Sequence, residues 1–231
     1  MEPLIEVEDL RFRYPDGVEA LCGIDFSLAA GETVALFGAN GSGKTTFLLH
    51  LVGLLSGEGG IRVRGRPVSK ESLPFIRKKV GFLFQDADDQ LFMPTVEEDV
   101  AFGPLNMGLP ASEVEQRVVE ALQRVAMEQV RGRAPHHLSA GQKRRVALAG
   151  VLAMQPEIIL LDEPATHLDP PSRDGLIEIL RELPQAKIMV THDTRLAAAL
   201  ADRAVFFDSG QIAGEGSVAQ IVEIFRWGAV G

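Results

Sequence analysis

Residues 38–45 read Gly-Ala-Asn-Gly-Ser-Gly-Lys-Thr and match the phosphate-loop pattern G-x-x-x-x-G-K-[ST]. Glycines at these positions let backbone N–H groups approach phosphate oxygens, and a helix that starts at the loop adds its positive end. Lys44 supplies a charge for the β- and γ-phosphates, and Thr45 offers a hydroxyl to Mg²⁺. The alternative is an ordinary glycine-rich turn. An apolar segment before the loop and a helical pattern after it favour the phosphate loop.

A second chemical feature is the acidic pair Asp162-Glu163, which ends the apolar run 158–161. Adjacent carboxylates at the tip of a buried strand are unfavourable unless a cation needs them. Asp162 is suited to reach Mg²⁺ through water, and Glu163, on the other side of the strand, is suited to face an attacking water as general base. The alternative is a solvated strand end before the turn at Pro164. The phosphate loop upstream favours the catalytic interpretation.

A third feature is the segment Leu138-Ser139-Ala140-Gly141-Gln142, which opens a helical pattern. Ser139 has the side chain of a helix N-cap, and the small residues beside it leave backbone N–H groups open to an anion. On physical grounds alone, a simple capped helix is the favoured interpretation.

These residues depend on regular elements to position them. Apolar segments predict strands at 4–10, 12–14, 24–28, 33–37, 80–84, 158–161, 187–190 and 205–207. Helical periodicity predicts helices at 44–54, 95–107, 112–127, 139–154, 171–183, 194–201 and 217–226. Ser112 and Glu115 have the spacing of a capping box. Apolar strands that alternate with helices indicate an α/β fold, with a mostly parallel sheet covered on both faces and a helical insertion at about 87–155.

Size and charge limit the class of protein. The 231 residues suit one domain with an inserted subdomain, and a net charge of −9 disfavours a nucleic-acid partner. The single cysteine, Cys22, excludes an intramolecular disulfide and fits a reducing compartment. We expect no signal peptide at the N-terminus, and no uncharged apolar run reaches the roughly 18–20 residues of a membrane span. Any membrane role is therefore expected to come through another protein.

The segment 138–142 resembles the signature motif of ABC ATPases, usually written Leu-Ser-Gly-Gly-Gln. Further positions follow in the family's order over about the whole chain. Tyr14 matches the aromatic residue that stacks on adenine, Gln85 the glutamine that couples nucleotide to the membrane partner, and His192 the histidine at the γ-phosphate. Leu168-Asp169 match the loop that communicates across the dimer. Singly, each side chain has an ordinary structural alternative, so their order carries the resemblance.

The resemblance implies one ABC ATPase domain over 1–231. Its core is a P-loop NTPase of the RecA-like type with an N-terminal antiparallel β subdomain, at about 1–86 and 156–231. The inserted helical subdomain, which carries the signature segment, is expected at about 87–155.

The family also implies site residues for ATP hydrolysis. The catalytic positions are Glu163 as base, with His192, Gln85 and Lys44, and the Mg²⁺ positions are Thr45, Gln85 and Asp162. The nucleotide-binding positions are Tyr14, Gly38, Asn40, Gly41, Ser42, Gly43, Lys44, Thr45, Thr46, Ser139, Gly141 and Gln142. Two ATP molecules are expected between two copies, with Ser139 and Gly141 supplied by the second chain. Ala140 and His167 replace glycines that are common in the family, and neither change removes a catalytic group.

The segments 85–92 and 94–106 resemble the ATPases of energy-coupling-factor importers, and most of all the cobalt/nickel branch. The partners implied are a transmembrane coupling subunit and integral membrane substrate-binding subunits, which place the chain peripherally on the cytoplasmic face of the membrane. A homodimer is expected, with a heterodimer of paralogues as the alternative. The alternatives for function are a vitamin importer, another ABC importer, or a soluble ABC ATPase without a transport role.

The same region predicts an acidic rim beside Gln85 that would receive a basic helix of the membrane partner. The rim comprises Asp86, Asp88, Asp89, Glu97, Glu98 and Asp99. An ordinary solvated face is the alternative.

Overall fold

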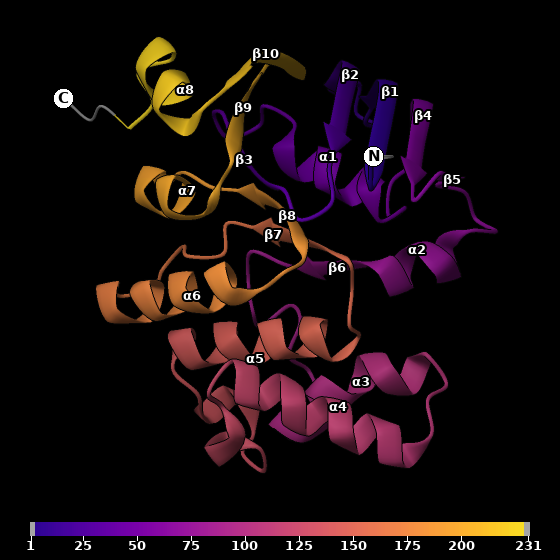
Figure 1. Ribbon diagram of the computed structural model, residues 1–231. Helices are drawn as coiled ribbons and strands as arrows, with labels where there is room; N and C mark the ends of the chain where they lie inside the picture. The colour runs from indigo at the N-terminus through magenta and orange to yellow at the C-terminus, as the bar shows by residue number, and fades with distance from the viewer. Residues whose placement is uncertain (1–2, 229–231) are drawn as a thin grey trace.

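Two β-sheets organise the chain in the computed structural model, which describes residues 3–228. The larger sheet has the strand order β10-β9-β3-β8-β7-β6 and is parallel except for β10. Its strands are β3 Thr33–Phe37, β6 Val80–Leu83, β7 Ile158–Asp162, β8 Ala186–Val190, β9 Arg203–Asp208 and β10 Gln211–Gly216. Helices join the parallel strands (Figure 1), which confirms the predicted α/β fold.

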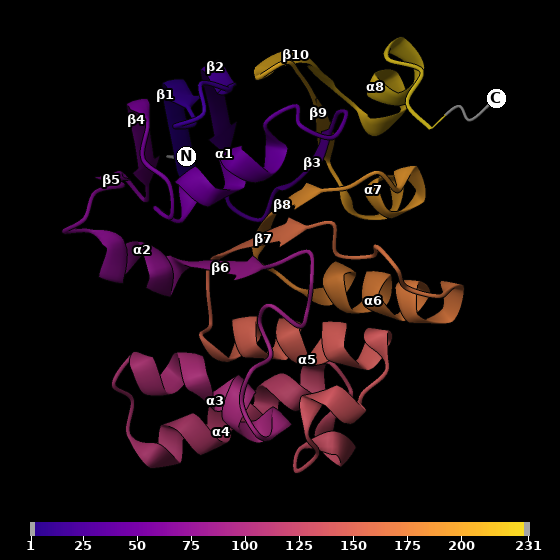
Figure 2. The same ribbon diagram turned by 180° about the vertical axis from the view of Figure 1, so that it is seen from behind.

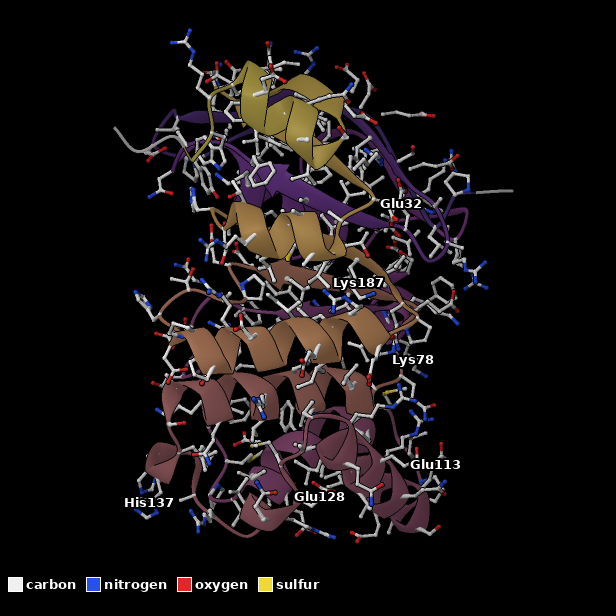
Figure 3. All side chains as sticks on the ribbon, turned by 60° about the vertical axis from the view of Figure 1, so that its left-hand side comes forward. Glu32, Lys78, Glu113, Glu128, His137 and Lys187 are labelled. Carbon is white, nitrogen blue, oxygen red and sulfur yellow. The ribbon has the colours of Figure 1, made fainter. Side chains whose placement is uncertain are left out.

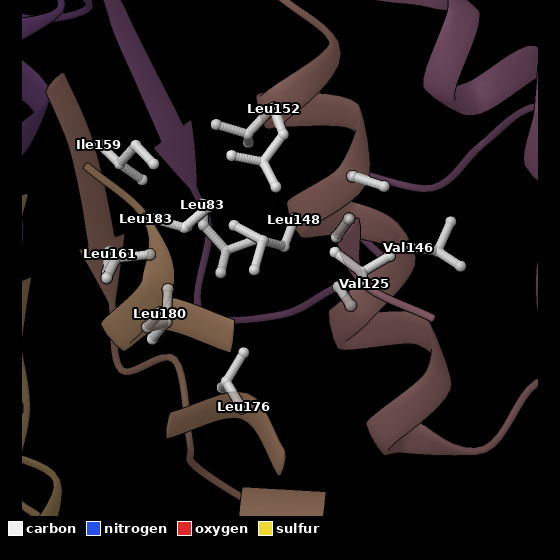
Figure 4. Close-up of a cluster of buried hydrophobic side chains, with 14 of the residues drawn as sticks. Leu83, Val125, Val146, Leu148, Leu152, Ile159, Leu161, Leu176, Leu180 and Leu183 are labelled. Atoms are coloured by element: carbon white, nitrogen blue, oxygen red, sulfur yellow. The ribbon is translucent and has the colours of Figure 1, made fainter. Parts of the chain in front are cut away.

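Both faces of the larger sheet are buried. On β7, Ile158 and Leu160 belong to one apolar core, while Ile159 and Leu161 belong to the other. This division follows from the alternation of side chains along a strand. Figure 4 shows the second core, where Ile159 and Leu161 face leucines of two helices. A strand buried on both faces has a continuous apolar sequence, and this explains why the run 158–161 could be recognised.

The smaller sheet is antiparallel, with the order β2-β1-β4-β5. Its strands are β1 Ile5–Arg13, β2 Glu19–Leu28, β4 Glu58–Val63 and β5 Arg66–Pro67. The prediction of separate strands at 4–10 and 12–14 was wrong, because β1 continues through an irregular register near Asp9, which has a φ of 45°. Sequence patterns did not reveal β4 and β5.

Three helices form a group at one end of the molecule, below β6 in Figures 1 and 2. They are α3 Val96–Asn106, α4 Ala111–Arg124 and α5 Ala140–Ala153, and the short 3₁₀ turns Glu128–Val130 and Pro135–His137 connect α4 to α5. The predicted capping box at Ser112 was wrong, because Pro110 is the N-cap of α4 and Ser112 lies inside the first turn. Capping boxes are present instead at Thr95 and Ser139.

The remaining helices follow strands of the two sheets. They are α1 Lys44–Leu51, α2 Leu73–Lys79, α6 Pro170–Glu182, α7 Thr194–Leu200 and α8 Val218–Ile224. Helix α1 ends before the predicted limit of 54, where Gly53 takes a φ of 66°. Helix α2 was not predicted. Within residues 3–228, none of the helices has the length and apolar character needed to cross a bilayer.

Candidate nucleotide-binding and hydrolysis site

The chemically important residues lie at the carboxyl ends of four neighbouring parallel strands. Strand β3 is followed by the phosphate loop, and its neighbour β8 is followed by His192. Strand β7 ends at the acidic pair, and β6 at the edge of the sheet is followed by Gln85. Parallel strands present their carboxyl ends at one edge of the sheet, where α/β proteins bind ligands. The topology therefore brings together residues that are far apart in the sequence, such as Asn40 and His192, which are 152 positions apart.

The phosphate loop connects β3 to α1. Helix α1 begins at Lys44 with Gly43 as its N-cap, and no side chain caps it. The first N–H groups of the helix are thus left for a ligand. The Lys44 ammonium is buried and donates to the carbonyls of Gly38, at 2.7 Å, and Ala39, at 2.8 Å. Burial lowers the pKa of Lys44, while Glu163 and Asp162 oppose this effect.

Asp162 ends β7 and is only 4% exposed. Burial raises its pKa, and the Thr45 hydroxyl and the Lys44 ammonium act in the opposite direction. Its Oδ1 atom is buried without a hydrogen-bond partner among the described residues. An unpartnered carboxylate oxygen beside a hydroxyl is a donor set that suits Mg²⁺, so these residues fit the ion.

Glu163 follows Asp162 with a φ of 46°, a strained value for a residue with a side chain. Its Oε2 accepts a hydrogen bond from Thr166 Oγ1 at 3.0 Å. His192 Nε2 lies 3.1 Å from Oε1, without the geometry of a hydrogen bond. Burial raises the pKa of Glu163, and nearby His192 opposes the shift. A raised pKa suits a general base. Sequence reasoning missed Thr166, whose only signal was a hydroxyl three residues after Glu163.

A cavity of about 510 Å³ lies in front of these groups. The predicted site residues that line it are Tyr14, Asn40, Gly41, Gly43, Lys44, Thr45, Thr46, Gln85, Asp162, Glu163 and His192. Gly38, Ser42, Ser139, Gly141 and Gln142 do not line it. Val18 and Ala20, which were not predicted, add an apolar wall near Tyr14. The Tyr14 hydroxyl lies 3.0 Å from Thr46 Oγ1, which ties the aromatic ring to α1.

The signature segment starts α5 but does not reach this cavity. Ser139 is exposed and accepts a hydrogen bond from the backbone N–H of Gln142 at 3.3 Å. Gly141 packs against α6, where an added Cβ would lie 2.5 Å from Ser172 Oγ. Ala140 lines a second cavity, and both cavities share Thr45, Gln85, Asp162 and Thr166. Within one chain, Ser139, Gly141 and Gln142 therefore do not line the first cavity.

Helix α5 also holds the segment that carries Gln85. The buried Arg144 guanidinium donates to the carbonyls of Phe84, at 2.6 Å, and Gln85. Burial lowers the pKa of Arg144, and Asp86 and Asp162 oppose the shift. The arginine connects the start of the signature helix to the loop after β6.

The predicted acidic rim is present in part. Asp86, Asp88 and Asp89 are exposed and line the second cavity together with Gln85, whereas the inclusion of Asp99 was wrong. Several of the carboxylates also have partners within the chain. Asp99 is buried and accepts hydrogen bonds from the backbone of Phe92 and Met93, each at 3.0 Å. Lys143 pairs with Asp88 at 2.6 Å, and Arg131 pairs with Glu97 at 2.5 Å. Glu98 completes the capping box of α3.

Comparison with known proteins assigns the chain to a family. A family model described as "ABC transporter" matches residues 21–166. The chain therefore belongs to the ABC transporter ATPases, and its activity is ATP hydrolysis.

Within that family the chain is of the energy-coupling-factor type. The energy-coupling factor transporter ATP-binding protein EcfA of Methanothermobacter thermautotrophicus is 51% identical over 229 residues, covering 96% of this chain and 73% of the relative. EcfA of Methanocaldococcus jannaschii is 48% identical over 224 residues, covering 94% and 80%.

Two solved structures share the fold. The structure of cbiO1 from Clostridium perfringens, described as part of the ABC transporter complex cbiONQ, has a TM-score of 0.86 at 36% identity and covers 98% of this chain and 92% of that one. A dimeric post-hydrolysis structure of the ATP-binding cassette MJ0796, bound to ADP and Pi, has a TM-score of 0.83 at 27% identity and covers 93% and 98%.

The backbone at position 167 suits a glycine. His167 has an exposed side chain and a φ of 64°. This left-handed backbone conformation is strained for a residue with a Cβ, whereas glycine adopts it freely. We expect His167→Gly to raise the free energy of unfolding by about 0.5–1 kcal/mol. Thermal unfolding measures this change, with His167→Ala as the control that removes the imidazole but keeps the Cβ. Equal melting temperatures for the two variants would contradict the explanation.

Proposed function

We propose that the chain energises a membrane importer of the energy-coupling-factor type through ATP hydrolysis by a dimer. The observation that carries this proposal is a cavity with a phosphate loop, an acidic pair and a histidine, from which the signature residues of the same chain are absent. A second copy would supply Ser139 and Gly141 to complete each site. The dimeric cassette with ADP and Pi supports this arrangement.

In this proposal, Lys44 and the N–H groups at the start of α1 bind the β- and γ-phosphates, and Tyr14 stacks on adenine. Thr45, Gln85 and Asp162 would hold Mg²⁺, which would neutralise phosphate charge when bound. Glu163 takes a proton from the attacking water, and His192 contacts the γ-phosphate. ATP favours the closed dimer because the signature residues contact it only there.

We further propose the division of the chain into a core with a β subdomain, at about 1–86 and 156–231, and a helical subdomain at about 87–155. Helices α3, α4 and α5 with their connecting turns lie in the second part. Arg144 connects the two parts through the carbonyls of Phe84 and Gln85. A movement of α5 would therefore also displace the backbone at Gln85.

The partners we propose are a transmembrane coupling subunit and an integral membrane substrate-binding subunit. An apolar patch suits the contact: Phe92, Phe102 and Leu105 are 61%, 41% and 57% exposed. The Phe92 and Phe102 rings meet edge to face at 5.0 Å. The chain would then lie peripherally on the cytoplasmic face of the membrane.

As cargo we propose a cobalt or nickel ion, on the likeness of residues 85–106 to the ATPases of that branch. A vitamin is the alternative, and the names of the relatives fit both. The binding specificity of the membrane subunit that holds the cargo would distinguish a metal ion from a vitamin.

The role of Glu163 is tested by Glu163→Gln. We expect kcat to fall by about 10²–10⁴-fold, because the amide cannot take a proton from water, while ATP binding is retained. ATP turnover and nucleotide binding measure the two effects. The control is Glu182→Gln, the same change at an exposed position on α6. Wild-type turnover in Glu163→Gln would show that another group is the base.

The apolar patch is tested by Phe92→Ser combined with Phe102→Ser. We expect the double variant to lose co-purification with the membrane subunits while ATP binding and thermal stability stay near wild type, because both rings are exposed. Leu54→Ser, at a position 51% exposed outside the patch, is the control. Undiminished co-purification of the double variant would exclude this surface as the contact.

A further inference from the structure

The only tryptophan of the chain lies against the site histidine. The ring of Trp227 stacks on the imidazole of His192, with centroids 5.4 Å apart and planes inclined by 27°. Trp227 also contacts Phe206 edge to face at 5.4 Å and Phe37 at 6.3 Å. The indole is thus held between the end of the larger sheet and His192.

Helix α8 places Trp227 at this position. A capping box at Ser217 starts the helix, and Phe225 beyond its end stacks on Phe206 at 3.9 Å with planes inclined by 2°. The backbone N–H of Trp227 then donates to the carbonyl of Val222 at 2.9 Å. Figure 1 shows α8 beside α7, the helix that follows His192 in the chain. These contacts, which anchor Trp227, therefore do not involve residues that line the nucleotide cavity.

The polar edge of His192 faces the site. Its Nε2 lies 3.1 Å from Asn40 Oδ1 and 3.1 Å from Glu163 Oε1. The side chain is 43% exposed, so few other contacts restrict its rotation. A flat ring stacked on one face limits that rotation and keeps Nε2 directed at the cavity.

We propose that Trp227 is a positioning residue for ATP hydrolysis and acts through His192. This inference rests on the proposed role of His192 at the γ-phosphate. Trp227 does not line the nucleotide cavity, so its effect belongs to the chemical step rather than to ATP binding.

The test compares Trp227→Leu and Trp227→Phe in the full chain at saturating Mg-ATP. Both side chains are apolar, but only phenylalanine retains a ring for the stack. We expect Trp227→Leu to lower kcat roughly three- to tenfold with KM for ATP unchanged, and Trp227→Phe to restore most of the loss. Equal losses in both variants would indicate general loss of packing and overturn the proposal.

His192→Ala separates this inference from the role of His192 itself. We expect Trp227→Leu to have no further effect on kcat when His192 is already alanine. If Trp227→Leu keeps wild-type kcat while His192→Ala loses turnover, the positioning role is wrong and the role of His192 stands. Wild-type turnover in His192→Ala would instead refute the role of His192, and this inference with it.

Fluorescence gives a second readout because Trp227 is the only tryptophan. We expect His192→Ala to shift the emission spectrum, since one face of the indole loses its cover. His137→Ala is the control, and His137 lies at the opposite end of the molecule from α8 in Figure 3. An unchanged emission spectrum in His192→Ala would contradict the stacking of Trp227 on His192.

Discussion

Two carboxylates and one ammonium group are held away from water at one edge of a parallel sheet. Asp162, Glu163 and Lys44 are 4%, 8% and 5% exposed, and burial shifts the pKa of each in the direction that favours its neutral form. Such a cluster is stable only if its charges balance one another or meet a charged ligand. The remaining features of the site can be understood as ways to hold this cluster and admit a triphosphate.

The cluster needs groups from several elements, and each is fixed by the backbone around it. The phosphate loop ends at the uncapped start of α1, and Glu163 is held in a strained turn. Arg144 secures the loop that follows β6, the strand beside β7. The signature residues lie elsewhere on the same chain, outside the nucleotide cavity. The proposal of a site shared by two copies follows from this separation.

Sequence patterns predicted the strands that carry the chemistry, because strands buried on both faces have continuous apolar sequences. The predicted bounds of strand β3, residues 33–37, are those of the structure. Strand β4 was missed because Gly59 and Gly60 interrupt its apolar pattern, and α2 is short and contains Pro74. The stack of Trp227 on His192 could not be predicted, since no local pattern relates residues that meet only through the tertiary fold.

We propose that each hydrolysis site is shared by two chains, and an experiment that mixes two inactive variants tests this sharing. Glu163→Gln keeps the signature segment, and Ser139→Arg keeps the acidic pair. In a mixed dimer, Glu163 of one chain would face Ser139 of the other and rebuild one intact site. We expect ATP turnover, nearly absent in each variant alone, to return when the two variants are mixed. A mixture as inactive as its components would show that the sites are not shared between chains.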